Sequence, residues 1–467
     1  MKPENKKTIS KTFVSKFAEL SGDFNPVHID LLAARRTIFG KTIVHGMALV
    51  LVALDRYLSD PTDLLYMKAI FHKAVFVEET VWIYEFDKSE TGQILIIRDS
   101  MGNKTTTVKL RVKDNKKRKQ TSAQKIFIKE PCLEFQPNSF KKKGFDTIDF
   151  NKKFARDLFP SLSINLPNDT VGFLLALTRI VGMKVPGLHS LFSGFVFENR
   201  CENVDSANNQ IEWVIKDFHK MHQMLLLEIQ SHNFISTVES FQRPKPVKQA
   251  RVDELSHLKN DSLQGKSILV VGGSRGIGEV CTKVAAIMGA SHITFTFNTG
   301  TEEARKIIGE LSSLGGTYTS AQYDITADCS SLAMDLRPDG IIFCATPAIH
   351  PNTKEFSVQN FNQFMDFYVH GILRLAAAFS YGKPLTIVMP STVFINKSDH
   401  VFTEYAAAKA AAEVVGKSLS SRYPNISFHS PRLGRVLTDQ SNSFLSTDYD
   451  NIILAASMLV ESLNLEV

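Results

Sequence analysis

The sequence predicts two architectures in one chain of 467 residues: an α+β first half with antiparallel strands, and an α/β second half with a doubly wound parallel sheet. An apolar helix at residues 47–58 is followed by alternating segments at residues 67–77, 80–88, 92–100 and 104–113. A similar helix at residues 170–182 is also followed by alternating segments. The second half opens with an apolar run, a glycine-rich turn and a helix start, which is the pattern of a βαβ unit.

The residues that indicate chemistry in the first half lie just before its first helix. Residues 17–46 read FAELSGDFNPVHIDLLAARRTIFGKTIVHG and include a carboxylate at Asp23 and an imidazole at His28. Acid–base chemistry on a carbonyl compound needs two titratable groups beside one reacting atom, and donors for the developing oxyanion. The unpaired N–H groups of a helix that begins near Gly46 are suitable donors. The competing interpretation is that GDFNP is only a turn and that His28 packs in a core.

The pattern D-x-N-P-x-H is complete as Asp23, Asn25, Pro26 and His28, and IVHG follows downstream. This set resembles the signature of the MaoC-like, (R)-specific enoyl-CoA hydratases. The resemblance implies a hot-dog fold, in which an antiparallel sheet wraps around the first apolar helix. It also implies that Asp23 and His28 are the catalytic pair that adds water to a 2-enoyl thioester, while the Gly46 N–H polarises the thioester carbonyl.

The first half also contains a weak internal repeat. VALDR at residues 52–56 aligns with LALTR at residues 175–179, and MKAIFHKAVFVEE has a counterpart in LHSLFSGFVFEN. We therefore expect a double hot dog, with one unit at residues 1–125 and another at residues 126–242, packed as one continuous sheet around two antiparallel helices. Chance similarity between two apolar helices is the alternative.

The second unit has no counterpart of the D-x-N-P-x-H signature. Asn168 and Asp169 stand where the first unit has His45 and Gly46. We therefore expect the second unit to be non-catalytic, to complete the acyl pocket and to replace a dimer partner. His189 in this unit is interpreted as structural.

Composition limits the other functions. The net charge is only +6, and the basic patches at residues 113–119 and 141–143 lack interleaved aromatics, so they do not predict nucleic-acid binding. The phosphates of coenzyme A or an acidic carrier protein are alternative partners for these lysines. The five cysteines are odd in number and lack a C-x-x-C pair, so we expect neither disulfides nor a metal site. With no apolar leader or membrane-length segment, we expect a cytoplasmic protein without membrane insertion, and a homodimer is possible.

Residues 243–266 are rich in charge and contain two prolines, which predicts a linker before a domain at residues 267–467. That domain begins with SILVVGGSRGIGEV. Glycines at this turn allow a tight bend, close approach of the backbone to a pyrophosphate, and exposure of the helix N-terminus to its charge. The following segments complete a βαβ unit, so a Rossmann fold is predicted.

GGSRGIG resembles the T-G-x-x-x-G-x-G motif of the short-chain dehydrogenases/reductases. Further along, VMPS and EYAAAK supply Ser391, Tyr405 and Lys409, with the last two on one helix face. By this resemblance, Tyr405 donates a proton to a ketone oxygen, Ser391 orients that oxygen, and Lys409 lowers the pKa of the phenol and holds the nicotinamide ribose. The family's N-N-A-G is replaced by Phe343, Cys344, Ala345 and Thr346, the relay asparagine is replaced near Tyr368, and a final strand is not recognisable.

The resemblance implies a nicotinamide cofactor. We expect NADPH (NADP+), because Arg275 offers a cation for a 2′-phosphate and Asn298 replaces the carboxylate that would bind a 2′-hydroxyl. The expected cofactor-binding residues are Gly272, Ser274, Arg275, Gly276, Ile277, Gly278, Asn298, Asp324, Ala345, Tyr405 and Lys409.

Together these resemblances favour a bifunctional acyl-thioester enzyme. It would reduce a 3-oxoacyl thioester with NADPH and interconvert the (R)-3-hydroxyacyl and 2-enoyl thioesters, as in fatty-acid- or polyketide-like metabolism. One alternative is an NADPH-dependent ketoreductase whose hot-dog half is a non-catalytic acyl-binding or assembly module. A second is an active hydratase on a nucleotide-binding scaffold.

Overall fold

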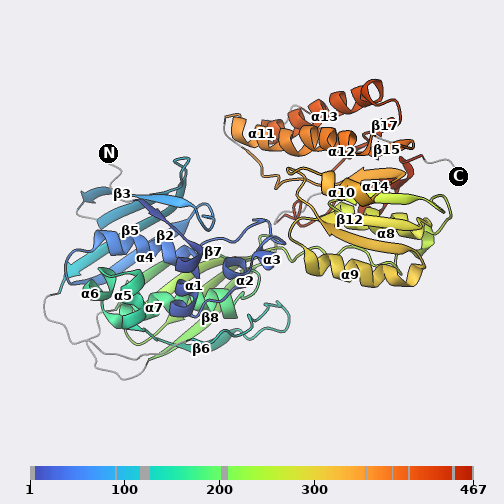
Figure 1. The fold of residues 1–467 in the computed structure, drawn as a ribbon. Helices are drawn as coiled ribbons and strands as arrows, with labels where there is room; N and C mark the ends of the chain where they lie inside the picture. Colours follow the sequence, from blue (N-terminus) through green and yellow to red (C-terminus); the bar gives the residue numbers. More distant parts are fainter. Residues whose placement is uncertain are drawn as a thin grey trace. The chain divides into compact units, whose positions relative to one another are not determined.

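The computed structural model describes residues 6–89, 92–115, 127–200, 209–352, 355–380, 382–397, 400–443 and 448–464. The chain forms two compact units, Met1–Lys245 and Pro246–Val467 (Figure 1). Within the described ranges, none of the helices has the length and hydropathy needed to cross a bilayer.

The first unit is built on one antiparallel sheet with the strand order β1-β3-β4-β5-β2-β7-β10-β9-β8-β6. This order is a palindrome, because β2 and β7 pair at its centre and every strand of the first half has a counterpart at the same distance in the second half. The strands are β1 (Lys6–Thr8), β2 (Thr62–Phe71), β3 (Thr80–Ser89), β4 (Gly92–Arg98), β5 (Lys104–Asp114), β6 (Lys143–Thr147), β7 (Ser190–Asn199), β8 (Gln210–His219), β9 (Met224–Gln230) and β10 (Phe234–Gln242).

The helices of this unit repeat in the same order. They are α1 (Lys11–Ser21), α2 (Pro26–Ile29), α3 (Leu31–Ala34), α4 (Gly46–Tyr57), α5 (Lys152–Leu158), α6 (Leu162–Asn165) and α7 (Asn168–Arg179), which continues as the π-helix η1 (Ile180–Lys184). The long apolar helices α4 and α7 share one core with the inward side chains of the sheet (Figure 1). The short helices cross over: α1 contacts α7, and α6 contacts α4. Each half therefore completes the surroundings of the other half's central helix.

The second unit contains a six-stranded parallel sheet with the order β13-β12-β11-β14-β15-β17. This is the predicted doubly wound arrangement, because the order reverses direction beside β11. The strands are β11 (Ser267–Val271), β12 (His292–Phe297), β13 (Thr317–Gln322), β14 (Gly340–Phe343), β15 (Leu385–Val388) and β17 (Ile426–His429), and a separate parallel pair is formed by β16 (Ser391–Thr392) and β18 (Arg432–Leu433).

Helices cover both faces of the parallel sheet. They are α8 (Gly276–Ile287), α9 (Thr301–Leu311), α10 (Ser330–Asp335), α11 (Val358–Met365), α12 (Gly371–Phe379), α13 (Thr403–Arg422) and α14 (Ile452–Glu461), with a π-helical turn η4 (Asp366–His370) between α11 and α12. Helices α8, α9 and α14 form one core and α11–α13 the other, on opposite sides of the sheet (Figure 1). Alternate residues of β11 divide between the cores, since Ile268 and Val270 lie in the first and Leu269 and Val271 in the second.

The sequence predicts a linker at residues 243–266, but several side chains of this segment are buried in the structure. Arg243 is 4% exposed and its guanidinium donates to the carbonyls of Ser190 and Leu188 in the first unit. Leu255 and Leu263 are buried in a core of the second unit. Only the few residues around Lys245 and Pro246 therefore separate the two compact units.

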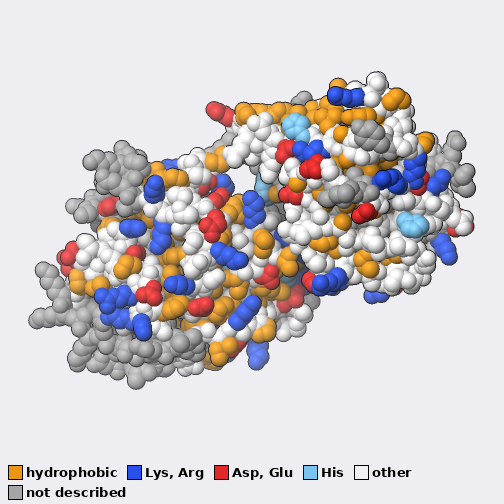
Figure 2. Space-filling model, in the orientation of Figure 1, with side chains coloured by type: hydrophobic (Ala, Val, Ile, Leu, Met, Phe, Trp, Pro, Cys, Tyr) orange, Lys and Arg blue, Asp and Glu red, His pale blue; other side chains and the backbone are white. Residues whose placement is uncertain are grey.

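The structure describes only part of the basic patches and the cysteines noted in the sequence. Residues 116–119 of the first basic patch and Cys201 lie outside the described residues, and the other four cysteines are free thiols. Lysine and arginine side chains on the face drawn in Figure 2 are interspersed with acidic and apolar ones.

Candidate functional sites

The loop that carries Asp23 is fixed at both ends by local structure. Helix α1 ends at Ser21, and Gly22 takes a left-handed conformation (φ 75°) that closes the helix with a bond from its N–H to Ala18 O. The hydroxyl of Ser21 then accepts a hydrogen bond from Asp23 N at 3.1 Å. Asn25 caps α2, with Pro26 at the first helical position. The residues GDFNP therefore form a turn, as the competing interpretation predicted. The same turn also places Asp23 close to His28.

Three polar side chains converge at this loop. The ligand-type atoms of Asp23, His28 and His45 lie within 4.8 Å of one another. Asp23 and His45 are buried at 1% and 0% exposure, whereas His28 is partly exposed. The rings of His28 and His45 are stacked, with centroids 3.7 Å apart and planes at 26°. The structure thus brings the predicted pair together and adds His45, which the sequence analysis did not assign to the site.

The hydrogen bonds of the two histidines assign their tautomers. His28 Nδ1 bonds to Ile43 O at 2.8 Å and His45 Nε2 bonds to Asp23 O at 3.0 Å. A carbonyl oxygen only accepts, so both of these nitrogens carry hydrogen. In the neutral rings, His28 Nε2 and the buried His45 Nδ1 therefore bear lone pairs, and His45 Nδ1 has no partner among the described residues. These atoms and the Asp23 carboxylate form a group of acceptors suited to a molecule that donates hydrogen bonds, such as water.

The same three residues are a poor set of metal ligands despite their proximity. A ring nitrogen directs its lone pair in the plane of the ring, and stacked rings direct their lone pairs side by side instead of toward one point. We therefore assign no metal to this group.

Burial moves the pKa values of the acid and the base toward each other. Burial raises the pKa of Asp23, although His45 and the Thr178 hydroxyl oppose the shift. Removal of its ring from water lowers the pKa of His28 well below its usual value, and the charges of His45 and Arg243 lower it further. A proton therefore moves between such groups at a lower free-energy cost than between groups with ordinary pKa values.

Helix α4 begins at Gly46 beside this group. Its cap residue His45 makes no side-chain capping bond, so the first N–H groups of the helix are open to an acceptor. A β-carbon at Gly46 would lie 2.9 Å from the ring of Phe71, which explains why this position has no side chain. The geometry at Gly46 is compatible with the predicted oxyanion role.

The second half of the first unit supplies a side of this site that the sequence analysis missed. Thr178 in α7 donates a hydrogen bond of 2.6 Å to Oδ2 of Asp23. The Asn25 side-chain amide donates to Gly182 O at 2.8 Å and to Gly187 O at 3.0 Å. Pairing VALDR with LALTR aligns Asp55 with Thr178, but only the cross-over of α1 onto α7 brings Thr178 to Asp23.

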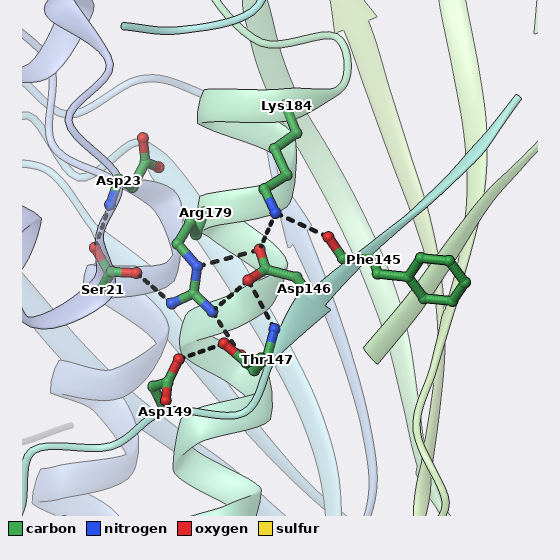
Figure 3. A network of polar contacts seen from close by, with 8 residues as sticks. All are labelled: Ser21, Asp23, Phe145, Asp146, Thr147, Asp149, Arg179 and Lys184. Carbon is green, nitrogen blue, oxygen red and sulfur yellow. Dashed lines mark hydrogen bonds and ion pairs between the residues drawn. The ribbon is translucent and has the colours of Figure 1, made fainter. Parts of the chain in front are cut away.

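Arg179 adds a buried ionic anchor (Figure 3). Its guanidinium bonds both carboxylate oxygens of Asp146 at 3.1–3.2 Å, and it also donates to Ser21 O at 2.9 Å and to Thr147 O at 2.6 Å. Lys184 reaches the same carboxylate at 3.2 Å. Because Ser21 directly precedes Gly22 and Asp23, this network connects the Asp23 loop to α7 and β6.

The second unit holds its predicted glycine turn between β11 and α8. Gly272 has φ 80°, and a β-carbon there would lie 2.8 Å from Ala345. A β-carbon at Gly278 would overlap with Gly272 O. Arg275, the cap residue of α8, makes no side-chain capping bond, so the N–H groups of Gly276, Ile277 and Gly278 face outward from the helix start. A tight turn with an open helix N-terminus is the arrangement that fits a pyrophosphate.

The other expected cofactor residues lie around this edge of the sheet. Ser274 is buried and Arg275 half-buried within the turn, and Asn298 and Asp324 are exposed after β12 and β13. Asp324 accepts bonds from Thr326 N and Oγ1 at 2.9 and 2.7 Å and lies 3.5 Å from the Asn298 amide.

Ser391, the predicted orienting residue, forms its side-chain hydrogen bond with a residue other than Tyr405. Its hydroxyl donates to Glu413 Oε1 at 2.5 Å, inside an ion pair between Glu413 and Arg432. The neighbouring residue Thr392 instead forms the side-chain hydrogen bond with Tyr405. Successive residues of a strand point to opposite faces, so a choice between adjacent hydroxyls depends on a strand register that the sequence alone leaves open.

Tyr405 and Lys409 lie on one helix face as predicted, but their electrostatics differ from the expectation. Burial raises the pKa of Tyr405 to about 12, so the expected lowering of the phenol pKa by Lys409 is not found. Burial also lowers the pKa of Lys409 to about 7. The Lys409 ammonium donates to Pro390 O at 2.7 Å and lies 3.8 Å from the centre of the Tyr368 ring. Tyr368, in the π-helical turn η4, therefore lies beside Lys409. This is the region of the sequence in which the family's relay asparagine is replaced.

Comparisons with known proteins find one family model in each of the two units. Residues 1–121 match the family model described as a MaoC like domain, and residues 266–447 match that of short chain dehydrogenase. No curated protein matches the chain.

Parts of the chain are similar in structure to solved proteins. One is a 3-oxoacyl (acyl-carrier-protein) reductase from Agrobacterium tumefaciens C58 with NADP bound, at 20% identity and a TM-score of 0.35, covering 40% of this chain and 75% of that chain. Another is L-sorbose reductase from Gluconobacter frateurii complexed with NADPH and L-sorbose, at 18% identity and a TM-score of 0.35, covering 38% and 73%. A third is the oxidoreductase yciK from E. coli, at 20% identity and a TM-score of 0.40, covering 44% and 91%. By the two family matches, the chain is a fusion of a MaoC-like domain, at residues 1–121, with a short-chain dehydrogenase domain, at residues 266–447.

Proposed function

We propose that the protein is a bifunctional acyl-thioester enzyme that reduces a 3-oxoacyl thioester with NADPH and interconverts the (R)-3-hydroxyacyl and 2-enoyl thioesters. The group formed by the buried residues Asp23 and His45 and the partly exposed His28 carries this proposal, because it places an acid and a base with shifted pKa values beside an open helix start. The two activities use the same class of compound, since the hydroxyl made by one is the hydroxyl lost in the other.

We also propose that the first unit is a double hot dog, with halves at residues 1–125 and 126–242. The palindromic strand order and the repeated succession of helices support this reading. In the first half, Asp23 lies two residues before the helix cap Asn25 and His28 three residues after it. The residues at the same distances from the cap Ser161 in the second half are Phe159 and Ile164. Neither can exchange a proton, which supports a single hydratase site.

In hydration, Asp23 and His28 hold a water molecule between their acceptor atoms. The pair takes a proton from the water as its oxygen bonds to C3 of the enoyl thioester, and returns a proton to C2. The Gly46 N–H donates a hydrogen bond to the thioester oxygen and so stabilises the negative charge that develops there. Dehydration follows the reverse course.

In reduction, a nicotinamide cofactor bound at the glycine turn would supply the hydride for the ketone carbon. Tyr405 supplies the proton for the ketone oxygen, Thr392 orients that oxygen through its hydroxyl, and Lys409 binds the ribose hydroxyls. The glycine turn at Gly272–Gly278 fits the pyrophosphate, and Arg275 reads the 2′-phosphate. Pantetheine thioesters of coenzyme A or of a carrier protein are the proposed substrates.

The experiment is a coupled incubation of the full-length protein with a 3-oxoacyl thioester and NADPH. Loss of NADPH and formation of hydroxyacyl and enoyl products are followed together, by absorbance and mass spectrometry. Reduction with subsequent enoyl formation supports the bifunctional enzyme. Reduction without any enoyl product, together with no hydration of added enoyl thioester, would favour the alternative, a ketoreductase with a non-catalytic acyl-binding half.

A further inference from the structure

The two halves of the first unit exchange contacts in a reciprocal way. We call the short helices that precede each long helix an overhang: α1–α3 in the first half and α5–α6 in the second. Thr178 of α7 holds the Asp23 loop in the first overhang. The equivalent helical residue, Asp55 of α4, holds the second overhang by accepting a hydrogen bond of 2.8 Å from Leu162 N. The helix of each half therefore supports the overhang of the other.

At these two equivalent contacts, the carboxylate belongs to opposite partners. In the first overhang the residue two positions before the cap Asn25 is Asp23, and in the second overhang the residue two positions before Ser161 is Phe159, which is fully buried. The carboxylate thus lies on the overhang at one contact and on the helix, as Asp55, at the other. A second carboxylate at position 178 would face Asp23 in a buried place, where two like charges are costly.

Thr178 is suited to hold a carboxylate. It is 3% exposed, it is neutral, and its hydroxyl donates to Oδ2 while Asn25 N donates to Oδ1 at 3.2 Å. One turn further along, a side chain at Gly182 would overlap with the same carboxylate. The second half therefore fixes the orientation of Asp23 in two ways. Thr178 donates a hydrogen bond to the carboxylate, and Gly182 leaves room for it.

We propose that Thr178 is a positioning residue for the acid–base chemistry of the first half, and that its hydroxyl keeps Asp23 oriented and ionised beside His28. This inference rests on the proposed hydratase function. The second half, which has lost the D-x-N-P-x-H signature, then contributes to the reaction as well as to the fold.

The test uses full-length Thr178→Val, which keeps the shape of the side chain and removes the donor. Thr178→Ser restores the donor. The matched control is Thr170→Val in the same helix, because Thr170 is also fully buried but its hydroxyl has no partner among the described residues. Rates of hydration of an enoyl thioester are measured across pH 5–9, with NADPH-dependent reduction and thermal unfolding in parallel.

We expect Thr178→Val to lower kcat for hydration roughly 10- to 100-fold, the range for a hydrogen bond to a charged group, with little change in KM. The hydroxyl lowers the pKa of Asp23, so its removal should move the acidic limb of the pH profile upward by about one unit. Thr178→Ser should recover most of the rate, and Thr170→Val should match the unmodified protein. Equal losses in both valine variants, or an unchanged pH profile in Thr178→Val, would overturn the assignment.

A separate readout distinguishes this proposal from the hydratase function itself. The pKa of Asp23 is measured by NMR on protein labelled with ¹³C-aspartate, with the resonance identified by its loss in Asp23→Asn. If the unmodified protein shows no hydration, the proposed function fails, but a raised Asp23 pKa in Thr178→Val would still support the positioning role. An Asp23 pKa that is the same in both proteins would contradict it.

Discussion

Gly182 lies directly against the carboxylate of Asp23, although 159 positions separate the two residues in the chain, and a β-carbon there would overlap with Oδ1. Gly182→Ala should therefore displace the Asp23 carboxylate from its present position beside His28. We expect hydration to fall by about 10² or more, within the range that general acid–base catalysis contributes, while NADPH-dependent reduction stays unchanged. The measurement is the ratio of the two activities in the same preparation.

Gly309→Ala is the matched control, because a β-carbon there meets nothing within 4 Å. A normal hydration rate in Gly182→Ala would mean that the carboxylate does not need its present position.

The adjacent hydroxyls of Ser391 and Thr392 should have separable effects. Thr392→Val removes the hydroxyl that bonds to Tyr405, and we expect ketoreduction to fall about 10- to 100-fold, as for other hydrogen bonds to reacting groups. Ser391→Ala removes a donor to the buried Glu413 carboxylate. It should lower the free energy of unfolding by about 1.5–3 kcal/mol and change kcat only slightly. Steady-state kinetics and denaturant titration check the two outcomes, and the reverse pattern would restore Ser391 as the orienting residue.

Lys409 should make the fold less stable at neutral pH. Its pKa is about 7 in the folded state against a model value of 10.5, so between these values the unfolded chain binds a proton that the native protein does not. Stability therefore rises with pH from about 7 to 10.5, and the penalty at pH 7 is on the order of 4 kcal/mol at 1.36 kcal/mol per pKa unit. Lys409→Met should unfold at a higher temperature than the unmodified protein at pH 7, and the difference should narrow near pH 10. A less stable Lys409→Met at pH 7 would contradict this linkage.

Cofactor preference should depend on Arg275. A 2′-phosphate paired with a guanidinium contributes on the order of 1.5–3 kcal/mol, so we expect NADPH to bind about tenfold or more tightly than NADH. Arg275→Ala should remove most of that difference without a comparable loss of NADH affinity. Fluorescence titration with both nucleotides measures this, and equal affinities in the unmodified protein would exclude Arg275 as the phosphate reader.

The sequence predicted those parts of the fold that depend on local patterns. The glycine turn before α8, the apolar helices α4 and α7 and the alternating strands all follow from periodicity and turn chemistry over short windows. The D-x-N-P-x-H spacing predicted that Asp23 and His28 meet, because both belong to one loop and the short helix after it.

The sequence patterns did not predict the contacts between segments that are far apart in the chain. Thr178, Gly182 and Arg179 approach the Asp23 loop only because α1 crosses onto α7, and no local pattern encodes that cross-over. The choice between Ser391 and Thr392 likewise depends on how β16 pairs with β18. Burial, which decides the pKa values of Tyr405 and Lys409, is also a property of the assembled core.

The central claim is tested most directly by the rate of enoyl-thioester hydration in Asp23→Asn. The amide keeps the size of the side chain but cannot exchange a proton, so hydration should fall by roughly 10²–10⁴. Ketoreduction should be almost unchanged, and Tyr405→Phe should give the opposite pattern. Hydration at the unmodified rate in Asp23→Asn, or no hydration above background in the unmodified protein, would mean that Asp23 and His28 form a turn and a packed imidazole instead of an acid–base pair.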